Sequence, residues 1–262
     1  MEVIGYVASV CIGLILGMLG GGGSILTIPI LVYLFHIDAV TASAYSLFIV
    51  GVTSLIGAIP KYRDHFVNLR TGIVFGIPSI LSIFITRMWI VPSIPEIVVQ
   101  PNGFVISRRF ALLGLFSLLM ILAAISILKN KKEPTPENHT DQLSLLILEG
   151  LIIGFLTGLV GAGGGFLIIP ALVLLTGLSF KTAVGTSLFI IAINSLIGFL
   201  GDVLNFQIDW RFLLTITTLA VCGILIGNRL STKIQAENLR IGFAWFVLVA
   251  GCLILVRELL YS

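Results

Sequence analysis

Long apolar runs, joined by short polar connections, constrain the fold of this chain more than any other feature. Each run is about as long as a helix that crosses a roughly 30 Å hydrocarbon core. The chain is 58% hydrophobic and only 10% charged, whereas a soluble domain has about 25% charged residues. We therefore predict an all-α polytopic membrane protein and exclude a soluble, disordered or disulfide-stapled one. The eight long helices are expected at residues 3–20, 39–59, 71–91, 110–128, 143–160, 182–200, 210–227 and 239–260.

Two shorter apolar runs, at residues 24–35 and 166–176, each follow a glycine cluster. At about 1.5 Å of rise per residue each covers under about 20 Å, which is too little to cross a bilayer. Each also contains a proline, Pro29 or Pro170, and both glycine clusters and prolines interrupt helices. We expect two half-helices, each joined to the preceding helix by a glycine break.

The two halves of the chain repeat each other. A shift of 141 residues aligns them without a gap, with 21 identities in the 45 positions that start at Gly13. The shift places Pro29 on Pro170 and the glycines at 22–23 on those at 163–164. Duplicated halves with matching helix breaks are typical of transporters, and the breaks indicate the binding site. The predicted organisation is an N-terminal membrane repeat at 1–128, a polar linker at 129–142 and a C-terminal membrane repeat at 143–262.

The Lys and Arg residues of the connections indicate how the halves are oriented. If each half crosses the membrane an odd number of times, the halves are inverted, and the 15 Lys and Arg residues divide as ten on one side and five, including Arg87, on the other. Four crossings per half would instead give parallel repeats, and the same residues would divide as eight against seven, which shows no bias. We expect inverted repeats in an inner or plasma membrane. The positive-inside rule then places the linker in the cytoplasm and the N-terminus outside.

The glycine breaks offer hydrogen-bond donors to an anion. Non-helical backbone at membrane depth must be buried in protein or line a watery cavity, and the start of a half-helix adds N–H groups and the positive end of the helix dipole. We expect a pocket between the halves that binds a small anion without a fixed positive charge. Close helix packing is an alternative role for the same residues. The predicted substrate-binding residues are Gly20, Gly21, Gly22, Gly23, Ser24, Ser46, Gly161, Gly163, Gly164, Gly165, Thr186, Ser187 and Asn194.

Few other reactive side chains lie near the apolar runs. Asp202 ends a predicted helix and is the candidate for proton coupling, with an ordinary interfacial charge as the alternative. Asn68 and Asp209 are expected to cap the helices that follow them. No cofactor, metal ion, nucleic-acid partner or enzymatic activity is predicted. The cysteines, which show no metal-ligand spacing and are expected to be buried free thiols, are Cys11, Cys222 and Cys252.

Several short motifs accompany the duplication. They are Leu19-Gly20-Gly21-Gly22-Gly23-Ser24 with Pro29, Val160-Gly161-Ala162-Gly163-Gly164-Gly165 with Pro170, Thr182-Ala183-Val184-Gly185-Thr186-Ser187-Leu188-Phe189, and Asp209-Trp210-Arg211. Together they resemble the motifs of the TauE/SafE family of sulfite or organosulfonate exporters, over nearly the whole chain. The resemblance implies export of a small sulfur-containing anion. Tyr45 departs from the pattern, because the family favours Thr there, as at Thr186, so unequal contributions from the two halves are an open alternative.

We therefore hypothesise an exporter of a small sulfur-containing oxyanion, such as sulfite or a sulfonate, that binds near the midplane. Its partners would be this anion and the lipid bilayer, and a homodimer is left open. A channel-like anion conduit and a membrane scaffold subunit without transport activity are the alternatives. Cation or metal transport is disfavoured, because few carboxylates, histidines or paired thiols lie in the apolar runs.

Overall fold

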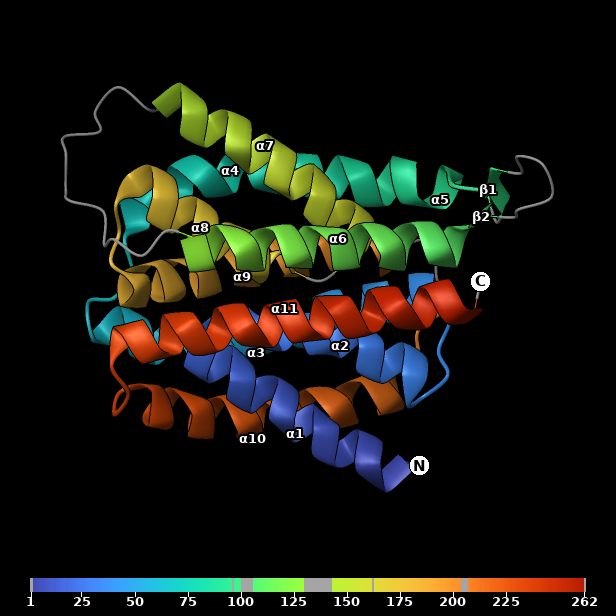
Figure 1. Ribbon diagram of the computed structural model, residues 1–262, viewed down its shortest axis with the longest axis horizontal. Coiled ribbons are helices and arrows are strands. Elements are labelled where there is room, and N and C mark those ends of the chain that lie inside the picture. The colour runs from blue at the N-terminus through green and yellow to red at the C-terminus, as the bar shows by residue number, and fades with distance from the viewer. Residues whose placement is uncertain are drawn as a thin grey trace.

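Helices form almost all of the structure, a computed structural model that describes residues 2–95, 97–99, 106–129, 143–161, 163–203 and 207–261. They lie side by side along one long direction, with both chain termini at the same end (Figure 1). The helices are α1 (Glu2–Leu19), α2 (Gly22–Tyr33), α3 (Ala39–Arg63), α4 (Leu69–Ile85), the π-helix η1 (Thr86–Ile90), α5 (Val91–Ser93), α6 (Arg108–Lys129), α7 (Leu143–Val160), α8 (Gly165–Thr176), α9 (Phe180–Val203), α10 (Trp210–Ser231) and α11 (Ala236–Tyr261). The strands β1 (Ile97–Val99) and β2 (Ile106–Ser107) pair in antiparallel fashion before α6.

Six helices among the described residues are long and apolar enough to cross a membrane, where the sequence predicted eight. They are α3, the continuous stretch from α4 to α5, α6, α9, α10 and α11. The apolar helices α1, α2 and α7 are shorter. Six such helices and the apolar composition give a multi-pass membrane protein.

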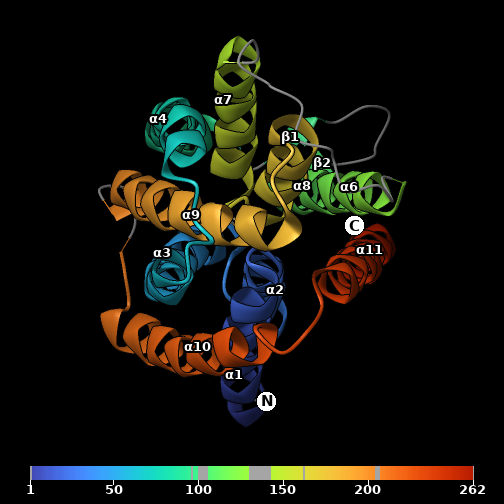
Figure 2. The same ribbon diagram turned by 90° about the vertical axis from the view of Figure 1, so that its left-hand side faces the viewer.

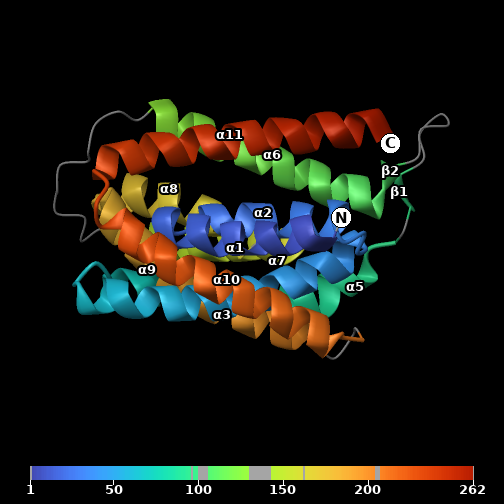
Figure 3. The same ribbon diagram turned by 90° about the horizontal axis from the view of Figure 1, so that it is seen from below.

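Helices α3 and α9 cross at the centre of the bundle, and the other helices pack around them. In each of these two, 72% of the most apolar window is buried, against 39% to 44% in the other candidate spans. The end-on view shows α4 and α7 on one side of α9, and α1 and α10 on the other (Figure 2). Helices α6 and α11 run together along one edge, opposite α3 and α10 (Figure 3). The central pair is therefore shielded from the surroundings on most sides.

The helix contacts recur when the halves are exchanged. Helix α1 packs against α10, and its equivalent α7 packs against α4. A methyl carbon added to Gly13 would collide with the backbone carbonyl of Ala220, whose carbon would lie 2.7 Å away. At the matching place in the other half, a methyl carbon added to Gly154 would lie 2.5 Å from the backbone oxygen of Ser79. These glycines allow backbones to touch, which is how helices associate tightly in lipid.

The outward surface of the bundle is apolar. Large side chains with more than half of their surface exposed include Trp89 on η1, Leu200 on α9 and Leu253 on α11. Lipid tails accommodate such a surface, whereas water does not. The prediction that the thiols are buried is wrong, because all three face this outer surface, where a thiol meets lipid at little cost. They are the free and exposed Cys11, Cys222 and Cys252.

The glycine contacts between α1 and α10 give a stability prediction with an internal control. Gly13→Ala should destabilise the protein by about 1–3 kcal/mol, because the added methyl group must push two backbones apart. Gly76 also lies inside a helix, but a methyl group there would meet no atom within 4 Å. Gly76→Ala should stabilise by about 0.5–1 kcal/mol through helix propensity. Thermal unfolding in detergent would measure both; equal melting temperatures would contradict the packing argument.

Candidate functional site

The two glycine breaks meet inside the bundle. A methyl carbon added to Gly165 would lie 2.5 Å from the Gly21 Cα, and one added to Gly21 would lie 2.8 Å from the Gly165 Cα. Only glycine permits two backbones to approach so closely. Gly20 and Gly161 end their helices with positive φ angles of 74° and 79°, a conformation that glycine adopts at little cost. The breaks therefore turn the chain and bring the starts of α2 and α8 together.

Both half-helices begin without a side-chain cap. The residue before α2 is Gly21 and the one before α8 is Gly164, and neither position has a side-chain hydrogen bond to the helix start. In contrast, the Asn68 side chain accepts a hydrogen bond from the Thr71 N–H at 3.1 Å, and Asp209 does the same for Phe212. This confirms the predicted caps of α4 and α10. Because the first N–H groups of any helix have no intrahelical acceptor, α2 and α8 present donors where the breaks meet.

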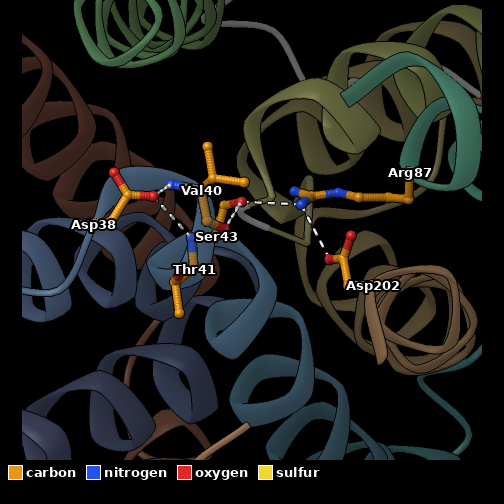
Figure 4. Close-up of polar contacts among 6 residues, drawn as sticks. All are labelled: Asp38, Val40, Thr41, Ser43, Arg87 and Asp202. Carbon is orange, nitrogen blue, oxygen red and sulfur yellow. Dashed lines mark hydrogen bonds and ion pairs between the residues drawn. The ribbon is translucent and has the colours of Figure 1, made fainter. Parts of the chain in front are cut away.

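A buried ion pair lies beside the second break, the one between α7 and α8. Arg87, in η1, is fully buried, and its Nη1 donates hydrogen bonds to Ser43 Oγ at 2.9 Å and to Asp202 Oδ2 at 3.1 Å. Figure 4 shows the guanidinium pointing toward both partners, which come from α3 and α9. A methyl group added to Gly161 would collide with Arg87 Nη2. The absence of a side chain at Gly161 thus leaves room for the guanidinium.

Several buried polar atoms around this break have no hydrogen-bond partner among the described residues. On Arg87 they are Nε and Nη2, and on Asp202 the atom is Oδ1. Ser195 Oγ is another, and it lies 2.9 Å from where a methyl carbon of Gly163 would be. Thr157 Oγ1, next to Gly164, also lacks a partner. Buried polar groups without partners are uncommon in proteins, so their concentration at one break distinguishes this region.

The predicted hydroxyl residues are distributed over α2, α3 and α9. Ser46 is fully buried, and its hydroxyl has no partner among the described residues. Ser187 donates to the Val184 carbonyl at 2.8 Å, and Ser24 donates to the Gly21 carbonyl at 2.6 Å. These last two hydroxyls are therefore occupied by bonds within their own helix or break.

Thr186 and Asn194 lie away from the ion pair. The Thr186 hydroxyl accepts from the Asn68 N–H at 2.9 Å, at the start of α4. Sixteen residues separate it from Asp202, or about 24 Å along α9. Asn194 Nδ2 donates to Ser79 Oγ at 2.6 Å, and Asn194 lines a small cavity of about 80 Å³ between α4 and α9. The structure does not gather all the predicted residues into one pocket.

The two breaks differ in their charged neighbours. A shift of 141 residues places Asn228 at the position of Arg87, Lys61 at that of Asp202 and Val184 at that of Ser43. Asn228 Nδ2 donates to the Gly57 carbonyl at 3.0 Å, and Lys61 Nζ donates to Ser231 Oγ at 2.7 Å. No ion pair between these equivalents is present in the described part of the chain. The backbone follows the repeat, but the charges do not.

Arg87 is a buried charge beside this break that the sequence analysis did not include among the candidate site residues. The sequence placed it among the five cations on the outer side, with a position inside a span as the alternative, and it lies fully buried within the stretch from Leu69 to Ser93. The second glycine break, where the sequence predicted an anion site without a fixed positive charge, therefore has a guanidinium beside it. The signal was present, because an ionisable residue inside an apolar run indicates function by default. Without Arg87 the outer side retains four Lys and Arg residues against ten.

Comparison with known proteins supports a transport function. A family model described as "Sulfite exporter TauE/SafE" matches residues 6–254. A probable membrane transporter protein of Bacillus subtilis, YunE, is 25% identical, over 94% of this chain and 96% of its own. One from Xylella fastidiosa (strain Temecula1) is 28% identical over 87% and 84%, and one from Methanocaldococcus jannaschii, MJ0441, is 26% identical over 94% of both. No solved structure matches the chain at a significant level.

Proposed function

Because the chain belongs to the TauE/SafE family of sulfite exporters, we propose that it carries a small sulfur-containing oxyanion, such as sulfite or a sulfonate, out of the cell. One observation carries the choice of an anion: two uncapped half-helix starts meet inside a membrane protein. Their N–H groups and helix dipoles attract negative charge. An inside-negative membrane potential also favours the export of an anion, by about 2.3 kcal/mol of free energy per charge per 100 mV.

The anion would bind where the breaks meet. The donors would be backbone N–H groups near Gly21, Gly164 and Gly165, together with the hydroxyl of Ser46 on α3 and, beyond the predicted residues, that of Ser195 on α9. Thr186 would serve the structure instead, because its hydroxyl already holds the start of α4. Rocking of one half against the other around this site would give alternating access.

We further propose that the halves are inverted repeats, with eight long helices and the two half-helices embedded in the membrane. Figure 1 supports this, because α3, α4 and α6 end where their equivalents α9, α10 and α11 begin. Among the described residues, most Lys and Arg residues of the connections lie at the end of the bundle where α3, α6 and α10 finish. The positive-inside rule places that end in the cytoplasm and the N-terminus outside.

Cysteine labelling would test this orientation. In a variant whose three native cysteines are replaced by serine, Thr232→Cys at the end of α10 should react with a membrane-impermeant maleimide only from the cytoplasmic side. Ser93→Cys at the end of α5 should react only from outside. Both positions are exposed, and each lies at a helix end. The same sidedness for both cysteines would contradict the topology.

Flux measurements would test the transport function. Proteoliposomes that contain the purified protein should release sulfite, sulfoacetate or thiosulfate faster than protein-free liposomes loaded with the same anion. The release of sulfate, compared with these three, measures the selectivity. A carrier should show saturation and counterflow, because the site faces one side at a time. Flux without either property would indicate a channel-like conduit. No flux of any of these anions would contradict the proposal and favour a scaffold role.

A substitution at the second break would test the site. Gly163 has a φ of 67°, and an added methyl carbon would lie 2.8 Å from Val50 and 2.9 Å from Ser195 Oγ. Gly163→Ala should reduce anion flux roughly tenfold or more, since small displacements of binding groups are costly in transport as in catalysis. Gly177, with a φ of 63° at the end of α8, is the matched control. Gly177→Ala imposes the same backbone strain and should retain most of the flux; equal losses would refute the site.

A further inference from the structure

We propose that Arg87 is the charged ligand of the transported anion, and that Asp202 and Ser43 position its guanidinium. The inference rests on the proposed function and adds to the predicted site a cation that the sequence analysis did not place there. It follows from the way the guanidinium nitrogens are used.

The guanidinium is held by one nitrogen only. Both of its hydrogen bonds, to Ser43 Oγ and to Asp202 Oδ2, are donated by Nη1. Nε and Nη2, which form the side edge of the planar group, have no acceptor among the described residues although Arg87 is fully buried. This edge carries two parallel N–H groups, and such a fork matches two oxygens of one oxyanion. The contacts of Nη1 therefore fix the orientation of Arg87 and leave its two-pronged edge available.

The available edge lies at the second break. Nη2 approaches Gly161 so closely that no side chain would fit there. The hydroxyls of Ser195 and Thr157, also buried and without partners among the described residues, border Gly163 and Gly164 of the same break. These two hydroxyls and the guanidinium edge surround the glycine break just before the uncapped start of α8. Together they form a donor set suited to a tetrahedral or pyramidal oxyanion, such as a sulfonate or sulfite.

Asp202 limits how strongly this site holds an anion. An unpaired buried guanidinium would attract an anion strongly and slow its release, whereas the Arg87–Asp202 pair is neutral overall. Hydrogen bonds from the fork then give recognition without a large net attraction. The repeat-equivalent position in the other half holds Asn228, whose amide nitrogen donates to Gly57. The ligand set is therefore unequal between the halves, with the guanidinium only at the second break.

Two single variants would test the assignment in sulfite-loaded proteoliposomes. Arg87→Lys keeps the charge but loses the fork, so KM for sulfite should rise about tenfold or more. Asp202→Asn keeps an acceptor for Nη1 but removes a negative charge near the anion, so KM should fall roughly tenfold while kcat also falls. A residue with only a structural role would not change KM and kcat in this paired way. Asn228→Ala, at the equivalent position, should leave KM within about twofold of the original value.

A double variant without either charge separates a loss of transport from a loss of folding. Arg87→Gln combined with Asp202→Asn removes both charges together, so no unpaired charge is left buried. It should keep the melting temperature of the native protein and lose sulfite release. Native KM in Arg87→Lys, an unchanged or raised KM in Asp202→Asn, or normal flux in the folded double variant would each overturn the assignment. Absence of flux from the native protein for every anion of the panel would instead refute the proposed function.

Discussion

A helix that is broken inside a membrane must have its free backbone groups buried in protein, because lipid offers them no hydrogen-bond partner. This constraint governs the arrangement of the whole bundle. Helices α3 and α9 cross at the centre and cover the breaks, and the breaks touch each other at Gly21 and Gly165. The remaining helices provide the apolar outer surface. Two segments that would be unstable alone in lipid become stable as a pair.

The buried ion pair extends the same logic to charge. Burying a guanidinium without a partner in such surroundings would destabilise the protein by several kcal/mol. A close carboxylate offsets this cost but adds little net stability. The side chains of Arg87 and Asp202 are fully buried, with 3.1 Å between Arg87 Nη1 and Asp202 Oδ2. A pair of apolar residues would fill the same space at no electrostatic cost. A charged pair in a place where it stabilises the fold little agrees with the role in ligand binding that we propose.

The duplication explains the frame of the site but not its chemistry. The close backbone contact of Gly13 with Ala220 in one half has an equivalent in the contact of Gly154 with Ser79. Such contacts recur because helix packing depends on where small residues lie. Side-chain hydrogen bonds recur as well: the Asp209 N–H donates to the Tyr45 hydroxyl at 2.7 Å, just as the Asn68 N–H donates to Thr186. The exchange of Thr for Tyr therefore preserves a structural bond. At Arg87 and Asn228 the halves diverge in charge, and there the repeat predicts position without function.

The sequence by itself determined the membrane class, the places where helices break and the caps at Asn68 and Asp209. These properties depend on local residue patterns: apolar length, glycine clusters and side chains next to a helix start. Only the tertiary structure decided that Gly21 meets Gly165 and that Arg87 pairs with Asp202, 115 residues away. It also showed that Thr186 serves the start of α4. Contacts between distant residues carry no periodic signal along the chain, because they arise only when packed helices bring particular faces together.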